Sequence, residues 1–128
     1  MKVNVLIDSY GWIEYFKEGP LLGKYSKFIE SAMKENSFTS SIILYEVYKR
    51  IKKEKDEQSA LTAYAYIIAH TTTVPVGKKI SLDAAEISLS ESLGMADSII
   101  MATARRFDAK IVTSDRHFKG KENIIFIS

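Results

Sequence analysis

The sequence contains no cysteine and only two histidines, His70 and His117. Disulfide bonds and thiolate metal sites are therefore excluded, and zinc, which normally needs several Cys or His ligands, is not expected. The Asp and Glu residues, 16 in total, are the only plentiful metal ligands. A metal site in this chain is therefore expected to be built from carboxylates, which favour Mg²⁺ or Mn²⁺.

The sequence also lacks any apolar run long enough to cross a membrane. Residues 1–12 have neither the hydrophobic stretch nor the small-residue cleavage site of a signal peptide. We therefore expect a cytoplasmic protein that makes no membrane contact. Its 128 residues predict a single domain spanning 1–128.

The net charge of +2 has little meaning by itself, but the basic residues are clustered. One cluster lies at 49–55 and another is spread over 105–121. Either could face phosphate groups. Solvated helix faces and helix C-termini explain the same clusters equally well.

Short apolar segments alternate with segments of helical spacing along the whole chain. Strands are predicted at 3–7, 38–39, 71–76, 109–115 and 123–127. Pro75 places the third of these at a sheet edge or a strand end. Nearly continuous apolar strands that alternate with helices predict an α/β fold, a three-layer α/β/α sandwich around a mainly parallel sheet.

Apolar residues at helical spacing mark two of the intervening helices, and the first of them is apolar on more than one face, which fits either a partner contact or burial in the core. The residues that mark the first helix are Leu61, Tyr64, Ala65 and Ile68. Those that mark the second are Leu82, Ala85, Leu89 and Leu93, in a helix that Ser81 could cap.

Four acidic residues are expected at one edge of the sheet. Asp8 follows the first strand and Asp115 ends the fourth, and the carboxyl ends of parallel strands share an edge. Asp97 begins a helix and Glu46 lies about one turn into another, so both belong near that edge. Each also has an ordinary explanation: a helix cap for Asp8, a helix-dipole charge for Asp97, a turn for Asp115 and solvent exposure for Glu46.

Carboxylates gathered in a small cleft repel one another unless protons or cations intervene. A divalent cation there makes bound water easier to ionise and stabilises the negative charge of a pentacovalent phosphate. The chemistry that fits four such acids is hydrolysis of a phosphodiester.

The segments that carry these acids resemble a known family. They are "LIDSYGWIEYF", "TSSIILYEVYKRI" and "LGMADSIIMATARRFDAKIVTSDRHF", followed by a closing "NIIFI" strand. In order and spacing they resemble the PIN-domain family, and more narrowly its small VapC-type toxins of bacteria and archaea. The most specific part is "ADSIIMATARRFDAKIVTSDRHF". Tyr10 departs from the small or aliphatic residue expected at its position, which could alter the mouth of the cleft.

The resemblance implies a parallel sheet and an endoribonuclease, dependent on Mg²⁺ or Mn²⁺, that cuts single-stranded RNA. The acidic quartet of the family corresponds to Asp8, Glu46, Asp97 and Asp115. Asp8, Asp97 and Asp115 would hold the metal directly or through water, and Glu46 would bind it through water or orient the attacking water. The resemblance also implies a VapB-like antitoxin partner and a homodimer.

Further residues are candidates for supporting roles. Ser9, Thr113 and Ser114 could hydrogen-bond the acids and fix their orientation. Arg116, Lys49 and Lys53 could contact RNA phosphates, although solvation is the better explanation of each charge taken singly.

Aromatic residues near the acids offer further alternatives. Trp12, Tyr10 and Tyr45 could stack on bases or belong to the core. His117 could be a general base or a turn residue that packs near Phe118.

Two other functions also fit the sequence. One is a PIN nuclease that processes RNA or acts on DNA outside a toxin pair. The other is a non-catalytic RNA-binding or interaction module in which the acids are structural.

Overall fold

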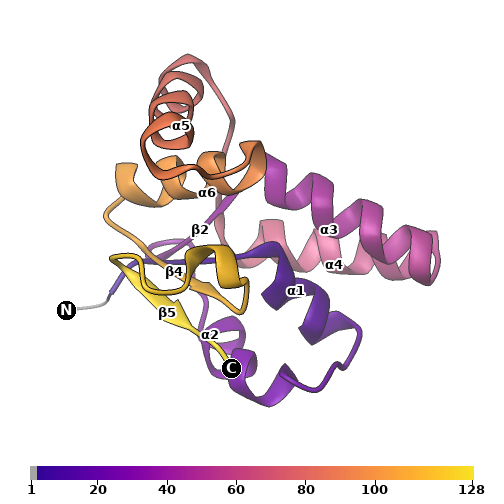
Figure 1. Ribbon diagram of the computed structural model, residues 1–128. Helices are drawn as coiled ribbons and strands as arrows, with labels where there is room; N and C mark the ends of the chain where they lie inside the picture. Colours follow the sequence, from indigo (N-terminus) through magenta and orange to yellow (C-terminus); the bar gives the residue numbers. More distant parts are fainter. Residues whose placement is uncertain (1–2) are drawn as a thin grey trace.

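A five-stranded parallel sheet forms the centre of the computed structural model, which describes residues 3–128 (Figure 1). The strands are β1 (Val5–Ile7), β2 (Ser37–Ser40), β3 (Thr72–Val74), β4 (Lys110–Thr113) and β5 (Ile124–Phe126). Their order is β3-β2-β1-β4-β5, and every neighbouring pair is parallel. The predicted α/β fold and the edge position of the strand before Pro75 are therefore confirmed.

Helices connect the strands and cover both faces of the sheet. They are α1 (Ser9–Phe16), α2 (Leu22–Glu30), α3 (Ser41–Glu54), α4 (Glu57–His70), α5 (Lys78–Glu91), α6 (Met95–Arg106) and the short 3₁₀ helix η1 (Arg116–Phe118). The crossovers from β1 to β3 run one way along the sheet and the return from β3 to β4 runs the other way. Right-handed crossovers then place α5 and α6 on the face opposite α1 and α2, as Figure 1 shows.

The core lies on both sides of the two central strands. Leu6 and Ile7 of β1 and Ile111 of β4 are buried, as is the whole side chain of Trp12. Trp12 packs beside Phe16 in this core, with ring centroids 6.4 Å apart. Of the two explanations for Trp12, base stacking is therefore wrong and core packing is right.

Helix α3 begins directly at the site edge of the sheet. The Ser40 hydroxyl accepts the Ile42 N–H at 3.2 Å and so caps this helix. Since β2 ends at Ser40, the helix begins directly at the carboxyl end of the strand, and its first turns lie at that edge of the sheet.

Most of the large apolar residues that mark α4 and α5 in the sequence are exposed, and smaller residues are buried beside Ile67, Ile80 and Ile87. In α4 the buried residues are Ala60, Ala63 and Ile67, whereas Leu61, Tyr64 and Ile68 are exposed. The reason is that α4 packs along α3, where small alanines permit close approach.

In α5 the helix begins at Lys78, with Gly77 as its N-cap, and buries Ile80, Ala84 and Ile87. Ser81 does not cap the helix, because its hydroxyl donates to the Gly77 carbonyl from inside the first turn. Leu82 and Leu89 are 70% and 82% exposed.

Among residues 3–128, no helix is both long and apolar enough to span a membrane. The single domain predicted over 1–128 includes Met1 and Lys2, which lie outside the described residues, and stays a prediction.

Gly11 lets α1 pack closely on α2, and this contact generates a prediction. A Cβ at Gly11 would lie 2.6 Å from Tyr25 Cε1 and 2.8 Å from Ile7 Cγ2, and both neighbours are buried. We expect Gly11→Ala to lower the free energy of unfolding by about 1–3 kcal/mol, as overpacking does. Gly23→Ala is the matched control, because nothing lies within 4 Å of its added Cβ. Chemical denaturation of both variants tests this, and equal stabilities would contradict it.

Candidate active site

Asp8 occupies the joint between β1 and α1. It is the N-cap of α1, and its Oδ1 accepts the Ser9 N–H at 2.7 Å. Its Oδ2 accepts the Thr113 hydroxyl at 2.8 Å, across from the end of β4. The residue is only 1% exposed. The cap explanation for Asp8 is therefore correct, and the same position buries a carboxylate at the carboxyl edge of the sheet.

Burial dominates the ionisation of Asp8. It raises the pKa of this carboxyl to about 7, while the hydrogen bonds from Thr113 and Ser9 oppose the rise. The charges of Glu46 and Asp115 add to the rise. Asp8 thus lies close enough to both acids for them to disfavour its ionised form.

Asp115 lies just beyond β4 and starts η1. Its Oδ1 accepts the His117 N–H at 2.9 Å, which makes it the N-cap of that turn. Its own N–H donates to the Thr113 Oγ1 at 2.9 Å. The Thr113 hydroxyl therefore links Asp8 to the backbone of Asp115, which fixes the ends of β1 and β4 relative to each other.

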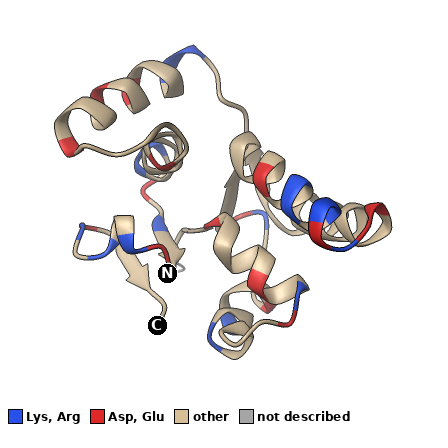
Figure 2. Cartoon of the chain, turned by 45° about the vertical axis from the view of Figure 1, so that its right-hand side comes forward, with Lys and Arg blue, Asp and Glu red and all other residues tan. Residues whose placement is uncertain are grey.

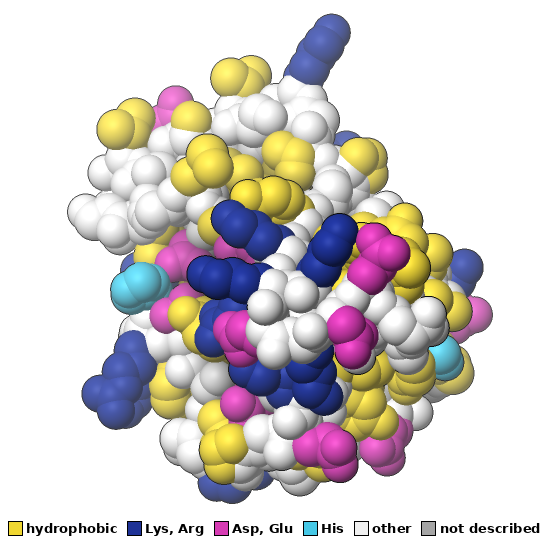
Figure 3. Space-filling model, turned by 90° about the vertical axis from the view of Figure 1, so that its right-hand side faces the viewer, with side chains coloured by type: hydrophobic (Ala, Val, Ile, Leu, Met, Phe, Trp, Pro, Cys, Tyr) yellow, Lys and Arg dark blue, Asp and Glu magenta, His cyan; other side chains and the backbone are white. Residues whose placement is uncertain are grey.

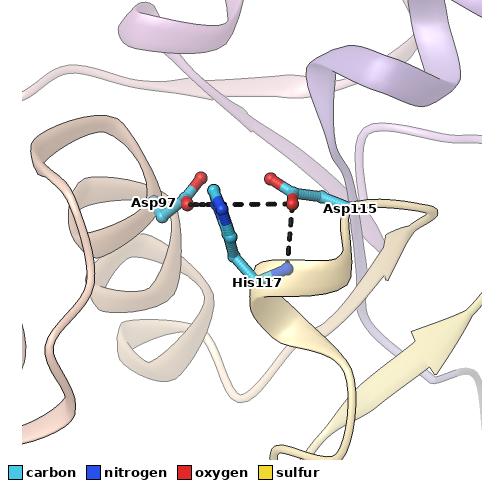
Figure 4. A group of neighbouring side chains, drawn as sticks. All are labelled: Asp97, Asp115 and His117. Atoms are coloured by element: carbon cyan, nitrogen blue, oxygen red, sulfur yellow. Dashed lines mark hydrogen bonds and ion pairs between the residues drawn. The ribbon is translucent and has the colours of Figure 1, made fainter.

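Asp97 approaches from the other side of the sheet, in the first turn of α6. Its Oδ2 lies 2.8 Å from His117 Nδ1, which is 3.4 Å from Asp115 Oδ1 (Figure 4). One ligand atom from each of the three residues can be chosen so that all lie within 4.8 Å of one another. Asp97, Asp115 and His117, which we call the trio, are therefore spaced so that one cation could contact all three.

The pKa values within the trio reflect this proximity. Burial raises the pKa of Asp97, and the hydrogen bond with His117 partly opposes it. The same hydrogen bond raises the pKa of His117, together with the charges of Asp115 and Asp97.

Glu46 lies in α3, outside the trio. Burial raises the pKa of Glu46, the nearby Ser9 hydroxyl opposes the rise, and the charges of Asp97 and Asp115 reinforce it. Its Oε1 is buried and has no hydrogen-bond partner among the described residues. A buried carboxylate oxygen without a donor is costly unless a cation or water satisfies it. The oxygen-rich donor set and this unsatisfied oxygen fit a divalent metal ion.

The three supporting hydroxyls lie in different surroundings. Ser9 and Thr113 both donate to Asp8, at 3.4 and 2.8 Å. Ser114 instead accepts the hydroxyl of Tyr25, a residue of α2, at 2.8 Å. This bond anchors the turn behind Asp115 to the core, because the Tyr25 side chain is buried.

A groove of about 300 Å³ opens beside Glu46. It is lined by Ser9, Tyr10, Ile13, Tyr45, Glu46, Lys49, Arg50 and Lys53. Figure 3 shows Lys and Arg side chains gathered across one face of the molecule, with acidic side chains beside them. Figure 2 shows the basic residues of α3 toward the end of that helix. Tyr10 and Tyr45 are exposed and line the groove.

Sequence reasoning missed Arg50 as a groove residue. Its signal is helical spacing, because Glu46, Lys49, Arg50 and Lys53 lie at i, i+3, i+4 and i+7 on one face of α3. Arg116, by contrast, is exposed and does not line this groove.

The fold and these acids define a parallel α/β protein with a carboxylate-rich site at the carboxyl edge of its sheet. The chain belongs to the PIN domain family, whose model matches residues 5–123. No curated protein matches the chain by sequence.

Solved structures share the fold at low identity. VapC20 of Mycobacterium tuberculosis, a toxin that cleaves the sarcin-ricin loop, has a TM-score of 0.81 at 15% identity, covering 98% of this chain and 100% of its own. A toxin-antitoxin complex from Klebsiella pneumoniae has a TM-score of 0.77 at 21% identity, with 95% and 96% covered. DNA-bound VapBC from Salmonella typhimurium has a TM-score of 0.73 at 16% identity, with 98% and 97% covered.

The buried carboxyl of Asp8 makes metal-free stability dependent on pH. As pH rises through 3.8 the unfolded chain loses the Asp8 proton, whereas the folded protein keeps it until about pH 7, so stability falls across this window. We expect Asp8→Asn in EDTA to be more stable than wild type at pH 8, by on the order of 2–4 kcal/mol, and equally stable near pH 4.

Thermal melts at a series of pH values check this prediction, with Asp56→Asn as control. Asp56 is the exposed N-cap of α4, and the backbone hydrogen bond from Ser59 lowers its pKa. Its carboxylate stabilises the fold above its unfolded pKa, so this variant should gain nothing at pH 8. A melting temperature for Asp8→Asn that falls at pH 8 would show that capping outweighs burial.

Proposed function

We propose that this protein is a metal-dependent endoribonuclease that cuts single-stranded RNA, and that it is the toxin of a VapBC-type toxin–antitoxin pair. The observation that carries the proposal is the meeting of Asp97 and Asp115 at the sheet edge, with Asp8 and Glu46 beside them and a cationic groove leading away. Membership of the PIN domain family and the fold shared with VapC structures support it.

In this proposal Asp97 and Asp115 hold Mg²⁺ or Mn²⁺, and Asp8 contributes directly or through water. When bound, the cation would supply the positive charge that offsets the developing charge on the phosphate. Glu46 has a raised pKa and an oxygen without a partner, so it suits the role of orienting the attacking water and accepting its proton. Attack by this water on phosphorus, in line with the bond to O3′, would break that bond. It would leave a 5′-phosphate on one fragment and, once O3′ takes up a proton from water, a 3′-hydroxyl on the other.

The groove is proposed to receive the RNA strand. Lys49, Arg50 and Lys53 would contact successive phosphates, and the exposed rings of Tyr10 and Tyr45 would offer surfaces on which bases stack. Because Glu46 lies on the same helix face as the three cations, a strand held there would pass the acids.

We also propose that the chain binds a VapB-like antitoxin and forms a homodimer. Two of the structural neighbours are toxin–antitoxin complexes, one of them bound to DNA. The exposed apolar side chains of α4 and α5 would be covered by such partners, since isolated soluble chains seldom expose clustered large apolar groups. These residues are Leu61, Tyr64, Ile68, Leu82 and Leu89.

Cleavage of a labelled RNA in Mn²⁺ tests the proposed function. We expect the purified chain to cut single-stranded RNA, EDTA to abolish cleavage, and Asp97→Asn to reduce the rate more than about 100-fold, because it removes a metal ligand. Asp83→Asn is the matched control, since Asp83 is an exposed acid of α5 that pairs with Lys79.

Three results would contradict the proposal. Full activity in Asp97→Asn would place the site elsewhere. Cleavage of DNA in preference to RNA would indicate a PIN nuclease of another kind. RNA binding without cleavage, in the presence of Mn²⁺, would indicate a non-catalytic module.

The groove generates a separate prediction about salt dependence. Each phosphate contact on a single strand contributes about 0.7 to the slope of log affinity against log salt concentration. We therefore expect Lys49→Ala with Lys53→Ala, in the Asp97→Asn background, to reduce the slope by about 1.4. Fluorescence anisotropy with single-stranded RNA measures this. Lys34→Ala, an exposed lysine outside the groove, should leave the slope unchanged, and an equal reduction there would contradict the proposed path.

A further inference from the structure

We propose that His117 is a direct ligand of the cation beside Asp97 and Asp115, and that its imidazole makes the site prefer Mn²⁺ to Mg²⁺. This inference rests on the proposed metal-dependent function. It goes further by assigning a nitrogen donor and a metal selectivity to a site that the acids alone would define as an all-oxygen one.

The spacing of the donor atoms supports ligation. Adjacent ligands of an octahedral cation at ~2.1 Å are ~3.0 Å apart, and opposite ligands are ~4.2 Å apart. His117 Nδ1 lies 2.8 Å from Asp97 Oδ2 and 3.4 Å from Asp115 Oδ1. His117 Nδ1 is therefore spaced from each carboxylate oxygen as adjacent ligands of one cation are, to within a few tenths of an ångström. All three ligand atoms lie within 4.8 Å of one another.

The turn after β4 places the imidazole at this point. Asp115 and His117 belong to the same short turn, and the His117 N–H donates to Asp115 Oδ1. The backbone therefore fixes the carboxylate and the ring relative to each other, while Asp97 comes from α6. Figure 4 shows the imidazole between the two carboxylates. An ion pair with Asp97 alone would not require the ring also to lie beside Asp115.

The exposure of His117 is consistent with this role. Its side chain is 73% exposed, so burial does not fix its orientation. The contacts that the structure gives this ring are with the two acids. The ring can therefore move by the small distance that ligation requires.

Ligand chemistry then determines the metal. Mg²⁺ strongly prefers oxygen donors and keeps its waters, whereas first-row transition metals accept imidazole readily. A site with two carboxylates and one imidazole should therefore bind Mn²⁺ more tightly than Mg²⁺. Since affinity for nitrogen-containing sites rises along the first row, Co²⁺ should bind more tightly than Mn²⁺.

The test measures metal binding by the whole chain without RNA. Titration calorimetry gives the Mn²⁺ affinity and competition gives the Mg²⁺ affinity. Loss of a residue that only orients a ligand already costs 10–100-fold in affinity, so we expect His117→Ala to weaken Mn²⁺ by about tenfold or more and Mg²⁺ by less than about twofold. His70→Gln, which changes the only other histidine, should alter neither.

A spectroscopic measurement distinguishes ligation from an indirect effect. Electron spin-echo spectroscopy of bound Mn²⁺, with ¹⁵N-labelled histidine, should detect a histidine nitrogen in the wild type and in His70→Gln but not in His117→Ala. Absence of this coupling in the wild type, or equal loss of Mn²⁺ and Mg²⁺ affinity in His117→Ala, would overturn the inference.

These outcomes separate the inference from the proposed function. If RNA is not cleaved but the His117-dependent Mn²⁺ preference is observed, the ribonuclease proposal fails and the ligand assignment holds. If cleavage depends on Asp97 but no histidine nitrogen couples to Mn²⁺, only the ligand assignment fails. Absence of any metal binding overturns both.

Discussion

The burial of carboxyl groups is the constraint around which this end of the sheet is built. Asp8 is almost completely buried, and the charges of Glu46 and Asp115 raise its pKa further. In the metal-free chain the Thr113 hydroxyl opposes this cost by donating to Asp8 and accepting the Asp115 N–H. One hydroxyl thereby contacts two acids that follow different strands, the side chain of Asp8 and the backbone of Asp115.

The sheet determines which residues meet in that place. Adjacent parallel β1 and β4 end at the same edge, so Asp8 and Asp115, which are far apart in sequence, become neighbours. Two helices that start at the same edge bring the remaining acids, because α3 follows β2 directly and α6 begins at the joint after α5. The site therefore needs no long functional loop. Its geometry is as rigid as the strand ends and helix starts that carry it.

Much of the fold follows from local pattern. Apolar strands bounded by acids and helix caps are visible along the chain, and the parallel topology converts them into a shared edge. The faces of α4 and α5 could not be read in the same way. Helical periodicity in the sequence is most visible in large apolar residues such as Leu82 and Leu89. In the structure the residues buried at the helix contacts include the smaller Ala63 and Ala84. Which stripe faces inward depends on the neighbouring helix, and a single sequence does not specify that neighbour's distance.

Within the candidate site, the acidic residues are easier to identify from the sequence than the residues around them. Position after a strand or at a helix start locates an acid without knowledge of side-chain orientation. The groove residue Arg50 required the helical face of Glu46 to be followed for a full turn, and the Ser114 contact with Tyr25 joins distant segments. The place of His117 between two carboxylates depends on the path of η1, which spacing alone does not reveal.

The acids and His117 differ sharply in their access to solvent, and this has a consequence for exchange. Asp8 is sealed beneath α1, whereas the His117 ring stands in water. An ion held by Asp97, Asp115 and His117 would therefore be open to solvent on the histidine flank, while the Asp8 carboxylate stays out of contact with water. A partner chain that covered the His117 ring would slow exchange of the bound cation with solvent, or prevent its binding, without contacting Asp8.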